Sequence, residues 1–332
     1  MRATVVIPTR DGRTLLADAL ESLGRQTVEH DVIVVDNAST DGTAELVAER
    51  FPRVRVLRLD ENLGFGRAVN RGVELVETPV VVLVNNDVVC EPEFVERIVE
   101  PFADAGVGMV AGVLVQHDAP ELVDSAGIEL DPTLRSWDQL WNRPAEELDG
   151  AAVPVGPCGG AAAYRAEAWR ATGGFDEAFF AYWEDVDLAL RLRLAGWGCV
   201  RAEDARARHR HGQTLGAASP AQRRLEAFGR GFVLARYRVG SLGLKTRLEI
   251  AALDWPVLTV HLFVRRESGP IRERRRGRRE GLARTPLRPP IELAAVSFRE
   301  ALGRQARQLS LRLSGRLPSH FGQTGARASA DH

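Results

Sequence analysis

The residues of this sequence that could do chemistry are carboxylates and amides placed where apolar runs end. The longest such run, residues 79–84, is mostly β-branched and stops at Asn85, Asn86 and Asp87. A shorter run stops in the same way at Asp36. Carboxylate oxygens bind hard divalent ions such as Mg²⁺, and they also accept hydrogen bonds from a bound nucleotide. The alternative for residues 85–87 is a simple turn that leads the chain into the next helix.

A second group of carboxylates could act as a base. Glu184, Asp185 and Asp187 open a predicted helix, directly after the aromatic stretch 179–183. An apolar wall around a carboxylate disfavours its charged form and makes it more basic. The alternative is that these carboxylates only stabilise the amino terminus of the helix, by about 0.3 to 1 kcal/mol each.

The elements that must position these residues are predicted from apolar periodicity. Strands are expected at residues 3–7, 32–35, 54–59 and 79–84, and each is followed by apolar residues at helical spacing. Four βα units in succession predict an α/β protein with a doubly wound, mostly parallel sheet and helices on both faces. Such sheets bind ligands at the carboxyl ends of their strands, so the polar clusters are expected to converge there. The first turn holds one glycine, Gly12, which argues against a GxGxxG dehydrogenase.

Composition narrows the setting of the protein. The chain has 332 residues and a net charge of −1, but residues 1–205 carry 36 acidic and 18 basic side chains, whereas residues 206–332 carry 9 and 26. This split predicts an anionic partner for the carboxyl-terminal third. The three cysteines are widely spaced and predict neither disulfides nor a zinc site, which fits a reducing cytoplasm. No secretory signal and no membrane-spanning helix are predicted.

Seven segments, in this order, resemble the family-two glycosyltransferases. They are VVIPTRDG from Val5, VIVVDNASTDGT from Val32, ENLGFGRAVNRG from Glu61, VNND from Val84, GPCGGAAAYR from Gly156, GGFDEAFFAYWEDVDLALRLRLAGW from Gly173 and RHRHGQT from Arg208. The order and spacing of the segments over residues 3–205 make the resemblance specific. Within the family, the sequence looks most like bacterial rhamnosyltransferases of cell-envelope assembly.

The resemblance implies the glycosyltransferase A fold and an inverting transfer of a sugar, such as rhamnose, from a nucleoside diphosphate sugar. The donor would be a dTDP or UDP sugar, and the acceptor a glycan or a polyprenyl-linked glycan. In this family Asp36 would hydrogen-bond the pyrimidine base. The residues that the resemblance assigns to donor binding are Pro8, Thr9, Asp11, Asp36, Asn62, Arg67, Asn85, Asn86, Gly159 and Gly160.

The resemblance also assigns the metal and the base. The family's aspartate-x-aspartate motif is Asn85-Asn86-Asp87 here, so Asp87 is the expected ligand of Mg²⁺ or Mn²⁺. A motif with one carboxylate puts tight binding in doubt, although phosphates and water can complete the coordination. His209, or else His211, is expected near the metal. Asp185 is the expected catalytic base, with Glu184 as the second choice and Asp187 in support.

The domain boundaries follow from these segments. Residues 1–215 are expected to form the catalytic domain, with a nucleotide-sugar half at 1–105 and an acceptor half at 106–215. Residues 216–316 are expected to form a basic, amphipathic helical region, and 317–332 a disordered tail. In the acceptor half, Trp137 and Trp141 either face the acceptor or close a loop against the core.

The helical region carries an interfacial pattern, which predicts binding to an anionic membrane. Apolar residues at near-helical spacing are followed by arginines, as in helices that lie on a bilayer surface. A polyprenyl-linked acceptor would place the protein in the cytoplasm, peripheral to the inner face of the plasma membrane. The apolar set is Leu253, Val257, Leu258, Leu262 and Phe263, and the arginines are 265, 266, 272, 274, 275, 276, 278, 279 and 284.

Two other functions remain open. A sugar nucleotidyltransferase shares such a sheet and such a metal, but it needs a glycine- and arginine-rich first loop, and residues 8–12 are a poor version of one. A non-enzymatic nucleic-acid-binding protein could use the basic region, but aromatic residues are not interleaved with the arginines, so no nucleic-acid partner is expected. The sequence does not indicate an oligomeric state.

Overall fold

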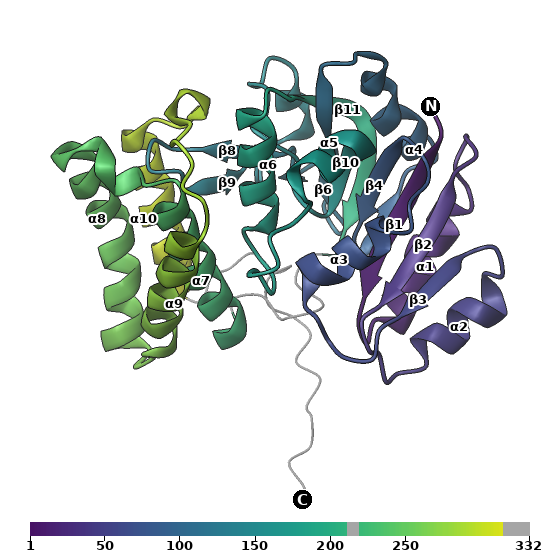
Figure 1. Cartoon of the computed structure of the whole chain (residues 1–332), viewed down its shortest axis with the longest axis horizontal. Coiled ribbons are helices and arrows are strands. Elements are labelled where there is room, and N and C mark those ends of the chain that lie inside the picture. The colour runs from purple at the N-terminus through teal and green to yellow at the C-terminus, as the bar shows by residue number, and fades with distance from the viewer. Residues whose placement is uncertain (211–218, 315–332) are drawn as a thin grey trace, which may run out of the picture.

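The computed structural model describes residues 1–210 and 219–314, with side chains up to residue 310. Within these residues, one nine-stranded sheet with helices on both faces lies beside a group of helices from the last third of the chain (Figure 1). The α/β class and the helical carboxyl-terminal region are therefore confirmed. His211 and the tail 317–332 lie outside the described residues.

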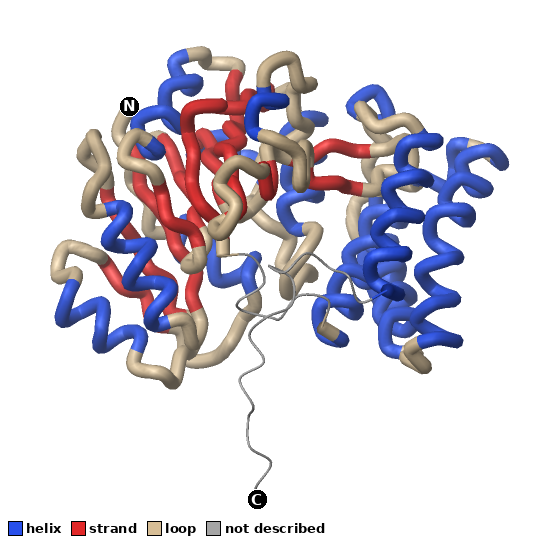
Figure 2. The backbone as a smooth tube through the Cα atoms, turned by 180° about the vertical axis from the view of Figure 1, so that it is seen from behind, coloured by secondary structure: helices blue, strands red, loops and turns tan. Residues whose placement is uncertain are grey.

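Six strands of the large sheet run in one direction, while β10 near its middle and the edge strands β5 and β7 run antiparallel to them. Its order is β3-β2-β1-β4-β10-β6-β11-β5, and β7 pairs with β6 off this path. Strands β8 and β9 form a separate two-stranded sheet, visible between the large sheet and the helices in Figure 2. The strands are β1 Ala3–Thr9, β2 Asp31–Asp36, β3 Arg55–Arg58, β4 Val80–Val84, β5 Val88–Cys90, β6 Val107–Gln116, β7 Val123–Ser125, β8 Ile128–Leu130, β9 Ser136–Asp138, β10 Ala161–Arg165 and β11 Gly198–His209.

The helices follow the strands in the expected alternation up to α4. Helices α5 and α6 also pack on the sheet, and α7 to α10 form the last third of the described chain. The α-helices are α1 Arg13–Leu23, α2 Thr43–Arg50, α3 Phe65–Val73, α4 Phe94–Val99, α5 Ala166–Thr172, α6 Glu184–Leu194, α7 Pro220–Arg236, α8 Leu244–Thr259, α9 Gly269–Ala283 and α10 Phe298–Ser314. A π-helical turn, η4 Val260–Val264, continues α8, and short 3₁₀ turns are η1 Glu100–Ala103, η2 Ala145–Leu148, η3 Val239–Leu242 and η5 Ile291–Leu293.

The core explains why the central run of the sequence does not alternate. All five residues of β4 are buried, because α1 and α4 cover one face of the sheet while α3, α5 and α6 cover the other. Val82 packs with Leu20 and Phe94 on the first face, and Val81 packs with Trp169 on the second. A strand buried on both faces has no polar side to show in its sequence.

The parallel strands bring the polar clusters to one edge. β1 pairs with β2 so that Thr9 lies opposite Asp36, and β1 also pairs with β4, whose carboxyl end leads into Asn85. β10 runs antiparallel between β4 and β6, so its amino end reaches the same edge and brings Gly160 to it. The predicted convergence of the polar residues on one sheet edge is thereby confirmed for these three strands.

Helices α7 and α9 pack unusually close together through glycines. A Cβ atom on Gly277 would lie 2.0 Å from the carbonyl oxygen of Phe228, and one on Gly281 would lie 2.4 Å from that of Phe232. The contact four residues further along α9 is also four residues further along α7, so the two helices run parallel. Helix α8, which lies between them in the sequence, leads the chain back to the starting end. The helical group also shares apolar cores with the sheet: Phe179 packs with Phe228 and Phe232.

The structure corrects the predicted amphipathic face of the helical region. Leu253 is fully buried, in a cluster with Trp137 and Val296, so it does not face outward. This also places Trp137 in the core, as one of the two readings of the sequence held. Several of the predicted membrane arginines are bound within the protein: Arg274 pairs with Asp254, Arg276 stacks over a phenylalanine ring, and Arg284 pairs with Asp176. No helix in the described ranges is long and apolar enough to cross a bilayer.

Candidate active site

Asp36 ends β2 with its side chain buried and one oxygen unused. Its Oδ1 accepts the backbone N–H of Ser39 at 2.9 Å. Its Oδ2 accepts no hydrogen bond from the described residues and lies 3.8 Å from Nε of Arg58. A buried polar atom without a partner is costly, so an unused oxygen at a sheet edge is suited to a ligand that donates a hydrogen. The arrangement fits the imide N–H of a pyrimidine base.

The first loop is tied to the neighbouring strands by side chains. Thr9 Oγ1 accepts a hydrogen bond from Asn86 Nδ2 at 2.9 Å. A Cβ atom on Gly12 would lie 2.3 Å from that same nitrogen, so a larger residue there would displace the Asn86 side chain. Asp11 is half exposed, with φ of 47°, and its Oδ1 accepts the backbone N–H of Thr40 at 2.7 Å. Thr9, Asp11 and Asn86 are therefore brought together.

Asp41 joins the starts of two helices. Its carboxylate accepts the backbone N–H of Thr43, at the start of α2, and that of Arg13, at the start of α1. Burial raises the pKa of Asp41, but hydrogen bonds from Thr43 and Arg13 outweigh it, so the pKa is lowered. The N-cap residue of α2 is Gly42, which has no side chain to cap the helix.

The other predicted donor-binding residues differ in placement. Asn62 Oδ1 accepts hydrogen bonds from Asn37 Nδ2 and from the backbone of Gly64, both at 3.0 Å, which braces the loop after β3 against β2. Pro8 is buried in β1 opposite Val35. Arg67 is exposed, and its Nε donates to the carbonyl of Glu177, in the loop before α6, at 2.8 Å.

The metal candidate Asp87 is buried beside a histidine. Its Oδ1 lies 3.3 Å from Nε2 of His209, and Nδ1 of His209 lies 2.5 Å from Asp124. Burial lowers the pKa of His209, but hydrogen bonds and charge from Asp124 and Asp87 outweigh it and raise the pKa to about 10. In the absence of a metal, the imidazole ring is therefore protonated and held between two carboxylates.

The oxygen atoms near Asp87 suit a hard cation. Oδ1 of Asn85 is buried and accepts no hydrogen bond from the described residues, and Oδ1 of Asp87 is buried with His209 as its neighbour. Hard divalent ions prefer such oxygen ligands. Within residues 1–210 and 219–314, however, no three His, Cys, Asp or Glu side chains are grouped to hold a metal ion. An ion at Asp87 would thus depend on oxygens that a diphosphate or water supplies.

The predicted base is held at the start of α6 by backbone donors. Asp185 accepts the N–H of Gly159 at 3.1 Å and that of Val186 at 2.8 Å. Burial raises its pKa, and these hydrogen bonds only partly offset the effect. The pKa of Glu184 is raised well above its usual value, by burial and by the charge of Asp185, and its Oε2 has no partner among the described residues. Backbone N–H groups thus orient the carboxylate of Asp185, whereas no described residue holds Oε2 of Glu184.

The aromatic loop before the base has an uncommon backbone. Tyr182 and Trp183 have φ values of 67° and 78°, in the left-handed region that bulky residues rarely occupy. Two contacts hold this shape. Phe65 N–H donates to the carbonyl of Phe180 at 2.6 Å, and the ring of Trp183 lies against Gly229 of α7, where a Cβ atom would come within 2.4 Å of it.

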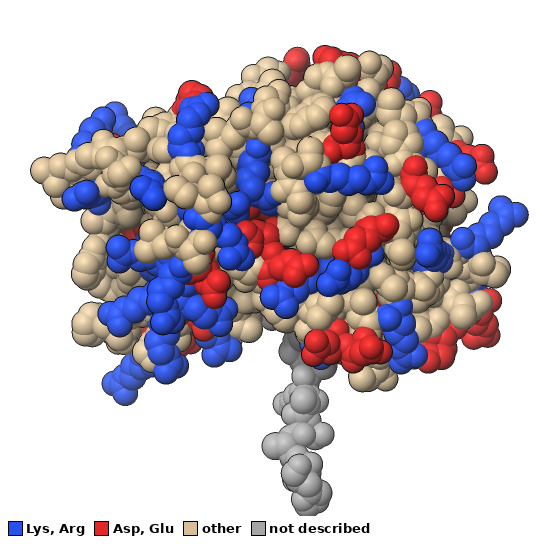
Figure 3. Space-filling view, in the orientation of Figure 1, with Lys and Arg blue, Asp and Glu red and all other residues tan. Residues whose placement is uncertain are grey.

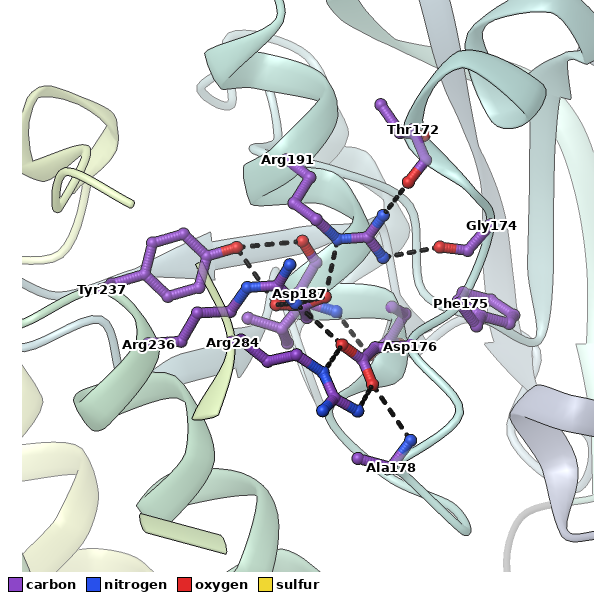
Figure 4. A network of polar contacts seen from close by, with 12 residues as sticks. Thr172, Gly174, Phe175, Asp176, Ala178, Asp187, Arg191, Arg236, Tyr237 and Arg284 are labelled. Atoms are coloured by element: carbon purple, nitrogen blue, oxygen red, sulfur yellow. Dashed lines mark hydrogen bonds and ion pairs between the residues drawn. The ribbon is translucent and has the colours of Figure 1, made fainter. Parts of the chain in front are cut away.

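Asp187 anchors α6 to the helical region (Figure 4). Its fully buried carboxylate accepts hydrogen bonds from Arg191 Nε at 2.8 Å, from Arg236 at 3.0 Å and from the hydroxyl of Tyr237 at 3.2 Å. Arg236 also reaches Asp176 at 3.1 Å. The predicted supporting position of Asp187 is thus a buried ion network that joins α6, α7 and the loop before α6.

The polar edge as a whole can hold a nucleotide at Asp36, a charged group at Asp87 and a reacting hydroxyl at Asp185. Comparison with known proteins decides among the functions left open. A family model described as "Glycosyl transferase family 2" matches residues 4–172, about half of the chain. The chain belongs to glycosyl transferase family 2. It is therefore a glycosyltransferase, and the competing functions of nucleotidyl transfer and nucleic-acid binding are set aside.

The relatives of this family-two glycosyltransferase include bacterial rhamnosyltransferases. It is 29% identical, over 211 residues, to the N-acetylglucosaminyl-diphospho-decaprenol L-rhamnosyltransferase of Mycobacterium tuberculosis, covering 56% of this chain and 68% of that protein. It is 23% identical to the O-antigen chain rhamnosyltransferase RfbN of Salmonella typhimurium, covering 64% and 68%. The predicted resemblance to bacterial rhamnosyltransferases is confirmed.

A solved structure supports the fold. The mannosyltransferase PcManGT from Pyrobaculum calidifontis, in complex with GDP-Man and Mn²⁺, aligns with a TM-score of 0.52 and 19% identity, covering 96% of this chain and 84% of that one. At this identity the likeness concerns the fold alone, and it confirms the glycosyltransferase A architecture.

Two residues of the site were not predicted. Asn37 accepts the N–H of Leu63 at 2.8 Å and donates to Asn62, so it ties the loop after β3 to the end of β2 beside Asp36. Asp124 orients His209 from β7, 85 residues earlier in the chain. Asn37 could have been found from its position directly after Asp36, whereas no local pattern marks Asp124.

Proposed function

We propose that this glycosyltransferase moves a sugar, with rhamnose as the first candidate, from a dTDP or UDP sugar to a glycan acceptor with inversion of the anomeric carbon. The observation that carries the proposal is the position of Asp185, a buried carboxylate at the start of α6 that the backbone N–H groups of Gly159 and Val186 hold in place. Burial raises the pKa of Asp185. A base with a raised pKa at the end of the donor-binding edge suits deprotonation of an acceptor hydroxyl.

The reaction would proceed in one displacement. Asp36 would accept a hydrogen from the base of the nucleotide, and the sugar would lie against Gly159 and Gly160, where side chains do not block the backbone. Asp185 would take the proton of the acceptor hydroxyl as its oxygen bonds to the anomeric carbon. The bond from that carbon to the diphosphate oxygen would break, and its electron pair would leave with the diphosphate. Direct attack from the opposite face inverts the configuration.

A divalent ion, Mg²⁺ or Mn²⁺, would be held by Asp87, with the amide oxygen of Asn85 as a second candidate ligand. When bound, such an ion neutralises the charge that develops on the departing diphosphate. His209, held between Asp87 and Asp124, would keep the carboxylate of Asp87 in place. The buried Oδ1 of Asn85, which accepts no hydrogen bond from a described residue, and the buried carboxylate of Asp87 support this assignment.

The acceptor is proposed to be linked to a polyprenyl lipid on the inner face of the plasma membrane, with the protein bound peripherally. The support is the relative from Mycobacterium tuberculosis, an N-acetylglucosaminyl-diphospho-decaprenol rhamnosyltransferase. The basic side chains gathered over the helical region, at the left of Figure 3, are consistent with an anionic surface nearby.

The test is a panel of nucleotide sugars with and without Mg²⁺ or Mn²⁺. We expect one donor to raise the melting temperature in a metal-dependent way, because a ligand that binds the folded state stabilises it. Proton NMR of the product should show an inverted anomeric centre. A product with the donor's own configuration would refute the single displacement, and release of pyrophosphate from a nucleoside triphosphate and a sugar phosphate would show a nucleotidyltransferase instead.

A further inference from the structure

The surface of the helical region carries an apolar patch that no part of the described chain covers. Three consecutive residues of η4 are exposed, Leu262 by 40%, Phe263 by 73% and Val264 by 62%. We call these three residues the apolar tip. Large apolar side chains that are exposed next to one another mark a binding surface more often than scattered ones do.

The tip stands at a turn between two helices, so it protrudes. α8 and α9 are joined by η4 and the short link 265–268, which Figure 2 shows as a loop at one end of the helical region. His261, in the same turn, is buried, which fixes the tip residues on the outer side. Three apolar side chains at a turn between helices offer a folded protein partner little area, but they can enter a lipid layer.

Basic residues follow the tip directly. Arg265 and Arg266 come next in the chain, and Arg272 lies exposed in the first turn of α9. The nearby acid Glu267 forms an ion pair with Arg223 at 2.5 Å, so its negative charge is already balanced there. Arg266 and Arg272 form no ion pair with a described residue, which leaves positive charge at the tip. Apolar side chains with a basic border are the pattern of proteins that bind an anionic bilayer.

The tip lies on the side of the molecule where the catalytic residues lie. α7 and α9 run parallel, so both begin at the end of the helical region that holds the tip. In Figure 1 this end, and the carboxyl ends of β1, β2 and β4, point the same way. A bilayer that received the tip would therefore face the sheet edge with Asp36 and Asp87.

We infer that the apolar tip, Leu262, Phe263 and Val264, inserts into an anionic lipid bilayer, with the neighbouring arginines against the lipid headgroups. This deepens the proposed function, because it rests on a lipid-linked acceptor, and it replaces the predicted face that included Leu253. A second exposed apolar group, Leu244, Leu248 and Trp255 on α8, provides the matched alternative, since it is equally apolar and belongs to the same helix.

The test is sedimentation of the full chain with phosphatidylcholine vesicles, with and without phosphatidylglycerol. We expect binding only with phosphatidylglycerol, reduced by salt. Replacing Leu262, Phe263 and Val264 by Ser should lower binding at least about tenfold. The same change at Leu244, Leu248 and Trp255 should leave it within about twofold. Arg265→Glu with Arg266→Glu should cost more than about tenfold.

A direct readout uses Phe263→Cys carrying an environment-sensitive dye. The emission of the dye should shift to the blue with anionic vesicles only. Wild type exposed to the same dye controls for labelling of the native cysteines, of which Cys90 and Cys199 are buried. Melting curves check that the variants fold. Loss of binding in the α8 variant alone, no binding by wild type, or a tip variant that changes oligomeric state instead would overturn the inference.

These results are separable from those on the proposed function. Vesicle binding is measured without any donor, and the tip variant is expected to keep metal-dependent stabilisation by a nucleotide sugar. Donor binding without vesicle binding would refute only the tip, and vesicle binding without transfer would refute only the proposed reaction.

Discussion

Asp187→Asn tests whether the buried ion network holds the base helix to the helical region. The wild-type carboxylate is fully buried and faces Arg191 and Arg236, whose side chains are only 10% and 11% exposed. Without its charge, Arg191 keeps only the backbone carbonyls of Thr172 and Gly174, and Arg236 shares Asp176 with Arg284. Removing one partner of a buried pair costs about 3 to 5 kcal/mol. Because the amide oxygen still accepts one hydrogen bond, we expect the lower end, about 3 kcal/mol.

Urea unfolding followed by circular dichroism measures this loss. The midpoint should fall while the slope stays unchanged, which is the signature of a change in stability alone. The matched control is Glu93→Gln, which breaks an ion pair of similar length with Arg97 on an exposed helix face and should cost no more than about 0.5 kcal/mol. A loss below about 1 kcal/mol for Asp187→Asn would show that the network does not carry the stability assigned to it.

The remaining predictions concern catalysis. Asp185→Asn should lower kcat by about 10² to 10⁴ with unchanged donor affinity, since it removes only the base, and near-normal turnover in a donor-saturated assay would contradict that role. Because the pKa of Asp185 is raised and only the carboxylate is a base, kcat/KM should fall on acidification at a pH above the ordinary aspartate value of 3.8; a pH profile checks this, and a flat one down to that value would exclude it. Asp87→Ala should weaken the binding of nucleoside diphosphate with metal far more than that of free nucleoside, and calorimetry showing equal losses would indicate misfolding instead.

Local pattern predicted the first half of the fold well. Strands β1, β2, β3 and β4 and the helices after them could be predicted because the spacing of apolar residues is a local property of each segment. Asp36 and Asp87 were found because a strand end is also a local feature. The antiparallel insertion of β10 between β4 and β6 was not predicted, since pairing partners depend on contacts between segments about 80 residues apart.

The rest of the site depends on long-range placement. Asp124 reaches His209 only through the pairing of β6 with β7 and β11, which no nearby sequence records. The burial of Leu253 likewise depends on Trp137 and Val296, which lie on either side of it in the chain. Helical spacing showed that α8 is amphipathic in part, but it could not tell which side the rest of the protein covers.

The contact between Gly229 and Trp183 couples helix α7 to the residues of the candidate base. The indole ring rests on the bare backbone of α7, and Trp183 is joined by one peptide bond to Glu184 and by two to Asp185. Any side chain at position 229 would have to displace this ring, and with it the start of α6. The packing of α7 against the aromatic loop therefore helps to fix the position of the two carboxyl groups.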